Sequence, residues 1–224
     1  MSLLGSAALA MWWDVAEDVL PEFEDWHTHE HFPERLGIPG FLRASRWTSL
    51  DGDGVFVMYE LADHQVLSSP RYVERLNTPS AWSVKMMPHH RNMVRSQCRV
   101  LESHGSAIAR QALTVRIASV EGRDALLRDA LHATIGRLVT RPGISGAHLL
   151  QHQRPAIAAT TEQKLRGGDR EADWVLVVVG YDPRALNQVA LVEAGAALVE
   201  GGVAAGVLAA LYALSTSATP TDVG

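Results

Sequence analysis

The chain has 224 residues, and 47% of them are hydrophobic, so it can bury a sizeable core. Its formal net charge is −5 and its acids and bases are interspersed without a basic stripe, which argues against nucleic acid as a partner. The single cysteine, Cys98, excludes an internal disulfide and leaves no cysteine spacing typical of a zinc or redox site.

The first eleven residues are mildly apolar and lack the basic start of a signal peptide, so we expect a cytoplasmic protein. Residues 189–214 consist mostly of Ala, Val, Leu and Gly and approach the length of a membrane span. However, Glu193 and Glu200 would each cost about 2.5–3.5 kcal/mol at a bilayer centre, and Gly201 would weaken a helix there. We therefore expect a buried helix and strand, and no membrane partner.

The first half of the chain predicts a strand, a helix, a hairpin of two strands, a short helix and a fourth strand. The first helix begins near Asp18, accepts Pro21 in its first turn and places Val19, Phe23 and Trp26 on one face. Residues 51–54, Asp-Gly-Asp-Gly, form a strong hairpin signal. The expected ranges, in chain order, are 7–15, 18–32, 41–48, 55–61, 70–76 and 92–101.

The second half repeats this order and adds a polar segment, residues 160–173, which contains Gly167-Gly168 and is predicted to be a mobile loop. Residues 218–224 are expected to be a disordered tail. The expected strands and helices, in chain order, are 113–120, 122–139, 144–153, 174–179, 183–199 and 206–215.

Two similar turns mark the same place in each half. Pro39-Gly40 follows the first helix, and Pro142-Gly143 follows the corresponding helix 103 residues later. Each half therefore predicts the ferredoxin-like order β-α-β-β-α-β, with units at 1–104 and 105–217. The predicted fold class is α+β: each antiparallel sheet carries helices on one face, and the two bare faces cover each other as a barrel within one chain.

Two segments of the first half resemble a known family. Asp25-Trp-His-Thr-His-Glu-His-Phe-Pro-Glu-Arg-Leu36, followed by Ile38-Pro-Gly-Phe-Leu-Arg43, resembles the EthD-like members of the dimeric α+β barrel superfamily, which carry a similar Trp…Glu-His-x-Pro-Glu-Arg-Leu…Pro-Gly-Phe pattern. The second half agrees only in element order, the Pro-Gly turn and the strand pattern. The resemblance implies two ferredoxin-like units with facing sheets. The superfamily contains cofactor-free monooxygenases, haem-binding enzymes, lactone isomerases and proteins of no known activity, so the resemblance does not select a reaction.

The end of the first helix carries the strongest candidate site. A histidine beside a carboxylate can transfer protons near neutral pH, and Glu30 continues the apolar face of the helix. We predict Glu30 and His31 as the catalytic pair of a small-molecule enzyme, with Trp26 and His27 shaping a pocket between the helices and the sheet. The open alternative is a polar helix end in which Glu30 bonds to the backbone or to Arg35.

Two strand residues complete the predicted ligand-binding set. Arg46 on the second strand and Tyr59 on the third would place polar groups in the same cleft; the alternative for each is a surface or interface position.

Metals and haem are less favoured. His27, Glu30 and His31 fit the H-x-x-E-H zinc pattern, but no third protein ligand is marked, so no metal is predicted. The second histidine cluster, His89-His90, is expected near the beginning of the first helix and away from His31, so that a shared site would need His27. No cofactor is the preferred prediction, and haem held by a single histidine stays open. The absence of Cys-x-x-Cys-His excludes covalently attached haem.

A second hypothesis is a non-catalytic structural protein. Five of the six tryptophans lie in the first half, and in this hypothesis they form a surface that is buried in a homodimer.

Overall fold

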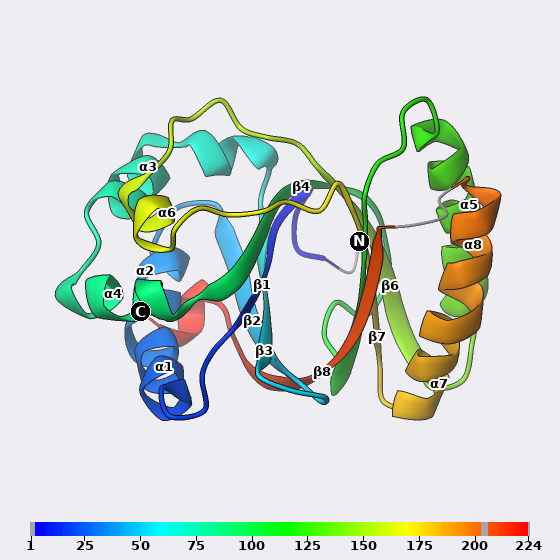
Figure 1. Ribbon diagram of the computed structural model, residues 1–224, viewed down its shortest axis with the longest axis horizontal. Coiled ribbons are helices and arrows are strands. Elements are labelled where there is room, and N and C mark those ends of the chain that lie inside the picture. The colour runs from blue at the N-terminus through cyan, green and yellow to red at the C-terminus, as the bar shows by residue number, and fades with distance from the viewer. Residues whose placement is uncertain (1–2, 203–205, 224) are drawn as a thin grey trace.

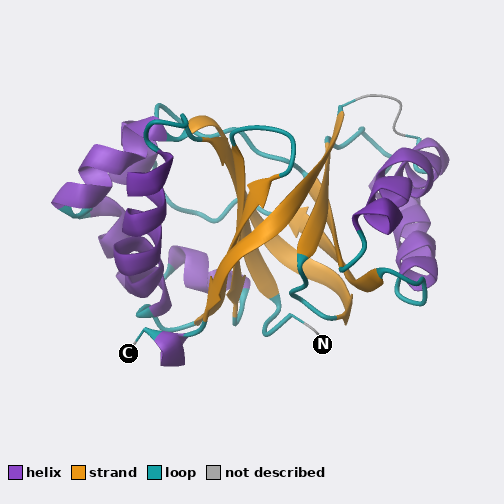
Figure 2. Ribbon diagram, turned by 90° about the horizontal axis from the view of Figure 1, so that it is seen from below, coloured by secondary structure: helices purple, strands orange, loops and turns teal. Residues whose placement is uncertain are grey.

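The protein is a closed barrel of eight antiparallel strands with a layer of helices on each of two opposite sides (Figures 1 and 2). The computed structural model describes residues 3–202 and 206–223. The strand order around the barrel is β1-β3-β2-β8-β5-β7-β6-β4. The first four strands thus lie in the order 4-1-3-2, and the second four repeat that order, as expected for tandem ferredoxin-like units.

The first half contains all elements of one unit and supplies the helices on one side of the barrel. Their bounds are β1 (Ala7–Asp14), α1 (Leu20–Trp26), the π-helix η1 (His27–His31), α2 (Phe32–Leu36), β2 (Phe41–Ser49), β3 (Gly54–Leu61), the 3-10 helix η2 (His64–Ser68), α3 (Pro70–Asn77), α4 (Ala81–Met86), the 3-10 turn η3 (Met87–His89) and β4 (Arg91–Gly105).

The second half supplies the other four strands and the helices on the opposite side. Their bounds are β5 (Gln111–Ile117), α5 (Asp124–Leu138), β6 (Ile144–His152), α6 (Thr161–Leu165), β7 (Trp174–Gly180), α7 (Pro183–Gln188), the π-helix η4 (Val189–Glu193), α8 (Ala194–Glu200), β8 (Val207–Ala218) and the 3-10 turn η5 (Pro220–Asp222).

The two sheets close on each other through two antiparallel pairings, β2 with β8 and β4 with β6. Side chains from both halves then fill the interior. Phe56 stacks between Trp12 and Trp47, with ring centroids 5.1 Å apart on each side, and Val175 and Val177 join the same apolar cluster. Two further apolar clusters lie outside the barrel, one under each helical layer. The predicted fold class is therefore confirmed.

Two local predictions differ from the structure, and a third gains detail. The helix expected to run to about Phe32 takes one more turn, through Pro33 to Leu36, because Pro33 lies in the first turn of α2, where its missing N–H is not needed. The predicted mobile loop at 160–173 contains α6. The predicted tail is regular up to Asp222: Ala218 pairs with Ala44, and Thr219 and Asp222 form a capping box.

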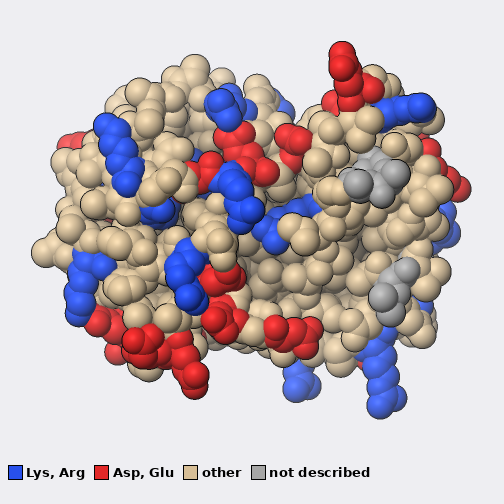
Figure 3. All heavy atoms as spheres, in the orientation of Figure 1, with Lys and Arg blue, Asp and Glu red and all other residues tan. Residues whose placement is uncertain are grey.

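The tryptophans lie inside the molecule. Five of the six are at most 3% exposed, including Trp26 beneath the helices and Trp47 in the barrel. The aromatic surface required by the structural hypothesis is therefore absent from the described residues. Figure 3 shows basic and acidic side chains interspersed over the face that it displays. No helix within 3–202 and 206–223 is long and apolar enough to cross a membrane.

Candidate functional site

A small cavity lies between the helices of the first half and the strands beneath them. Among the described residues, its polar lining consists of three histidines, three arginines, two tyrosines and one glutamate. Trp13, Met87 and Met93 belong to its apolar lining. The free space is about 20 Å³, which is room for about one water molecule. In the free protein, side chains therefore fill most of this polar site.

The π-helix η1 places two histidines in the cavity wall. Its wider turn bonds the Phe32 N–H to the carbonyl oxygen of His27, and such turns are frequent at functional sites. His27 and His31 share the face that packs on the sheet, with ring centroids 5.2 Å apart. Their exposures are 1% and 6%. The structure therefore places both residues in the wall of the cavity.

His90 joins these two histidines from the opposite side. Its ring lies 4.8 Å from the ring of Trp13, and its Nδ1 donates to the Met87 carbonyl at 3.2 Å. The prediction that the second histidine cluster lies away from the first is wrong for His90, because α4 packs against α1 and brings the chain back beside the end of that helix. The neighbouring His89 is exposed.

Glu30 faces away from the cavity. Its Oε1 accepts hydrogen bonds from Trp26 Nε1 at 3.1 Å, from Ser80 Oγ at 2.5 Å and from Ser83 Oγ at 3.4 Å. Within the described part of the chain, it forms no hydrogen bond with His31. The two residues are connected through Trp26, whose ring centroid is 4.6 Å from that of His31. The structure thus does not bring the predicted catalytic pair together.

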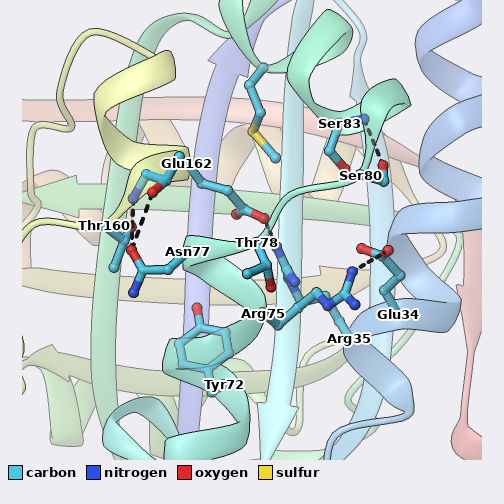
Figure 4. Close-up of polar contacts among 12 residues, drawn as sticks. Glu34, Arg35, Tyr72, Arg75, Asn77, Thr78, Ser80, Ser83, Thr160 and Glu162 are labelled. Atoms are coloured by element: carbon cyan, nitrogen blue, oxygen red, sulfur yellow. Dashed lines mark hydrogen bonds and ion pairs between the residues drawn. The ribbon is translucent and has the colours of Figure 1, made fainter.

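The carboxylate in the cavity belongs instead to Glu162, a residue that the sequence interpretation missed. Glu162 reaches from α6 to Arg35, and Figure 4 shows this contact. The figure also shows Asn77 of α3, which accepts a hydrogen bond from the start of α6. Glu162 Oε1 lies 2.5 Å from Arg35 Nη2, and both residues are 2% exposed. The sequence did contain a signal for the helix that carries Glu162. Thr160-Thr-Glu-Gln163 matches a capping box, and in the structure the Thr160 hydroxyl accepts a hydrogen bond from the Gln163 N–H.

The burial of the histidines keeps them uncharged. Loss of water lowers the pKa of His27 well below its usual value, and the positive charge of Arg46 adds to the effect. Burial lowers the pKa of His31 in the same way, assisted by Arg35. For His90, burial lowers the pKa to about 3. All three imidazoles are therefore neutral at pH 7.

The charged and phenolic groups beside them keep their protons. Burial alone would lower the pKa of Arg35, but the Glu162 carboxylate together with Tyr72 and Tyr59 outweighs it, so the pKa of Arg35 is raised. Burial raises the pKa of Tyr59, which remains a neutral phenol.

Several buried polar atoms of this site have no hydrogen-bond partner within residues 3–202 and 206–223. They are the Nδ1 atoms of His27 and His31, the hydroxyl of Tyr59 and Nη1 of Arg35. An unpaired buried polar atom costs about 1–3 kcal/mol, so four of them around one cavity indicate a place for water or a ligand.

The other two predicted ligand-binding residues lie behind the cavity wall. Trp26 is fully buried and holds the rings of the histidines in place. Arg46 is 4% exposed and donates to the Ser215 hydroxyl at 3.2 Å and to the Glu24 carbonyl at 3.3 Å. Of the six predicted site residues, His27, His31 and Tyr59 therefore line the cavity.

Pockets for organic ligands usually have volumes of about 300–1,000 Å³. In the closed form that the structure shows, neither haem nor an aromatic substrate fits this cavity without movement of its walls. Among the residues that the structure describes, no group of three or more His, Cys, Asp and Glu side chains could hold a metal ion.

No family model matches the chain, and no curated protein matches it. Solved structures do. An anthrone oxidase-like protein is 12% identical, with a TM-score of 0.67 and coverage of 98% of this chain and 96% of that one. A proposed monooxygenase from Fusobacterium nucleatum is 12% identical, with a TM-score of 0.62 and coverage of 96% and 95%.

A third similar structure is a ferredoxin-fold protein from Listeria monocytogenes that is related to antibiotic biosynthesis monooxygenases. It is 8% identical, with a TM-score of 0.51 and coverage of 94% of this chain and 96% of that one. At these identities the likeness shows the fold alone: the chain shares the ferredoxin-like α+β barrel architecture of these structures along almost its whole length.

Proposed function

We propose that the protein is a small-molecule enzyme that removes a proton from its bound substrate and oxidises the resulting anion with dioxygen, without a cofactor. One observation carries this proposal: two buried, neutral histidines, His27 and His31, have unpaired Nδ1 atoms beside one cavity. The oxidase and monooxygenase descriptions of the similar structures favour oxidation over other uses of a proton acceptor.

The reaction begins with the transfer of a proton from an acidic C–H group of the substrate to the imidazole of His31 or His27. A neutral imidazole can accept this proton, and the substrate anion that forms beside it stabilises the imidazolium. The Tyr59 hydroxyl and Arg35 donate to the oxygen on which negative charge develops. Dioxygen then takes electrons from the carbanion and becomes bonded to the same carbon, and the imidazolium returns its proton to the reduced oxygen.

Glu30 has a different role in this proposal from the one its sequence position indicates. Its carboxylate is occupied by Trp26, Ser80 and Ser83, so it fixes the indole that packs on His31 and does not contact the substrate. It is a positioning residue.

The alternative of a non-catalytic oligomerising protein loses its main support, because four of the five first-half tryptophans are buried within the chain and only Trp82 is half-buried. A homodimer stays a prediction, independent of the proposed reaction.

The proposal is tested by oxygen consumption with anthrone-type substrates, which have an acidic C–H between aromatic rings. We expect His31→Gln to lower turnover by about 100-fold or more, which is the usual contribution of a general base. His29 is exposed on the same π-helical turn, so His29→Gln is the matched control and should turn over like the wild type. Full activity in both His27→Gln and His31→Gln would refute the proposal.

A further inference from the structure

The cavity of the first half is closed by a segment of the second half. The segment between β6 and β7 crosses the molecule and places α6 over the helices of the first half (Figure 1). It brings Glu162, which is the one carboxylate among the described cavity-lining residues. An acidic side chain of an inserted segment therefore occupies a site that the rest of the lining makes basic.

The three arginines around this carboxylate differ in how far they rely on Glu162 as their polar partner. Arg166 has its own partner, because its Nη2 lies 2.8 Å from Asp169 Oδ2, and it reaches Glu162 only at 3.8 Å. Arg95 donates to the Tyr72 hydroxyl at 2.9 Å. Arg35 has its closest anionic partner in Glu162, and its Nη1 is unpaired. A guanidinium with one free edge in a dry pocket is suited to a second carboxylate or phenolate oxygen.

The attachment of α6 allows it to move. The helix has five residues, too few to be stable alone, so it depends on its contacts. At its start, the Thr161 N–H donates to Asn77 Oδ1 of α3 at 3.0 Å. After its end come Gly167 and Gly168, with φ values of +82° and +99° and open space around both α-carbons. The helix is held by the hydrogen bonds of Thr161 to Asn77, by the Arg35–Glu162 pair and by the packing of Leu165 on the core. Because two glycines follow it, it can swing away from the cavity once the pair with Arg35 is exchanged for a ligand.

We infer that Glu162 holds the place of the substrate's anionic group in the free protein, and that the substrate is a flat small molecule with one carboxylate or ionised phenol. On binding, that group takes the position of the Glu162 carboxylate on Arg35 while α6 moves outward. Trp13 and Tyr72 supply flat walls, and Met87 and Met93 supply walls that adapt to the ligand. The inference rests on the proposed function for the use of this cavity, but it concerns binding and not oxidation.

The first test is a binding titration of the full chain with three probes of one shape: 2-naphthoate, 2-naphthol and the neutral 2-naphthamide. Glu162→Gln removes the competing charge, so it should bind the anionic probe about tenfold more tightly than the wild type, with 2-naphthamide unchanged. Lys164→Gln, on the same helix, is the control and should bind like the wild type. Tighter binding of naphthoate in Glu162→Gln assigns a carboxylate ligand, and tighter binding of naphthol assigns a phenol. Equal affinity of wild type and Glu162→Gln for both probes overturns the inference.

A second variant keeps the test decisive if Glu162→Gln does not fold, since that change leaves Arg35 unpaired. Asn77→Ala removes the bond at the start of α6 and leaves the Arg35–Glu162 pair intact. Stopped-flow measurement of the tryptophan fluorescence should show the probe associating at least about threefold faster with Asn77→Ala than with the wild type. An unchanged association rate argues against displacement of α6 and overturns the inference. If the probes bind as expected but both His27→Gln and His31→Gln retain full turnover, the proposed oxidation fails and the inference stands.

Discussion

Trp26 donates its indole N–H to the Glu30 carboxylate at 3.1 Å, while the face of the same indole lies against His31. This relationship separates a residue that sets the position of a histidine from a residue that takes part in proton transfer. Glu30→Ala should lower the free energy of unfolding by about 1–2 kcal/mol, because it removes hydrogen bonds from Trp26, Ser80 and Ser83 to a charged group. Urea denaturation measures this loss.

A second variant at this position, Glu30→Gln, distinguishes the two roles of Glu30 in catalysis. If Glu30 only positions Trp26, Glu30→Gln should lower turnover moderately and leave the shape of the pH–rate profile unchanged. If turnover by Glu30→Gln no longer rose or fell on one side of the pH–rate profile, Glu30 itself would be the group that transfers the proton.

The shared barrel interior predicts that the two halves unfold together. Phe56→Ala should cost about 3–5 kcal/mol, because Phe56 is fully buried between Trp12 and Trp47 and beside Tyr212 from the last strand. Leu208→Ala should change stability by less than about 0.5 kcal/mol, because that side chain is 60% exposed. Urea denaturation followed by fluorescence and by circular dichroism should give one coincident transition. Two separate transitions would contradict a common core.

The sequence was informative about the fold for a physical reason. Pro39-Gly40 and Pro142-Gly143 mark turns whose glycines need positive φ, observed at +96° and +90°, and an apolar strand follows each turn. Both signals are local. The strand order then follows from the ferredoxin-like topology, and the pairing of the two sheets follows from their need to cover an apolar face.

The site was only partly predictable, because some of its contacts join residues that are near each other in the sequence and others join residues that are far apart. The i, i+4 spacing of His27 and His31 is local and was enough to place both in one wall. The π turn is not visible in the sequence, because one extra residue in a helix has no distinct composition. Glu162 meets Arg35 across 127 positions of sequence, and nothing near either residue specifies the other.

The buried histidines predict a loss of stability in acid. Each has a folded-state pKa below its ordinary value of 6.5, so the unfolded chain binds more protons as the pH falls below about 6.5. Their contribution is complete above that pH and for His90 is lost between about 6.5 and about 3. Inside this window His90 contributes a slope of about 1.4 kcal/mol per pH unit.

A matched pair of variants isolates the contribution of His90 to this pH dependence. Urea denaturation at several pH values between 7.5 and 5 gives the slope of unfolding free energy against pH. In His90→Gln this slope should be smaller by the amount that corresponds to about one bound proton. His89→Gln should keep the wild-type slope, because His89 is exposed. Identical slopes in the two variants would mean that His90 is not buried in its neutral form.

The junction between the two sheets predicts a strict requirement for glycine. Gly146 on β6 faces Gly105 on β4, and a β-carbon on Gly146 would lie 2.1 Å from the Ser106 carbonyl oxygen. The backbones approach so closely that Gly146→Ala must push β4 and β6 apart, which should cost about 1–3 kcal/mol. Gly136→Ala is the control, since Gly136 is exposed inside α5 with open space around it, and should stabilise by about 0.5–1 kcal/mol. Thermal denaturation should therefore move in opposite directions for the two variants, and a Gly146→Ala protein as stable as the wild type would exclude this close contact at the barrel seam.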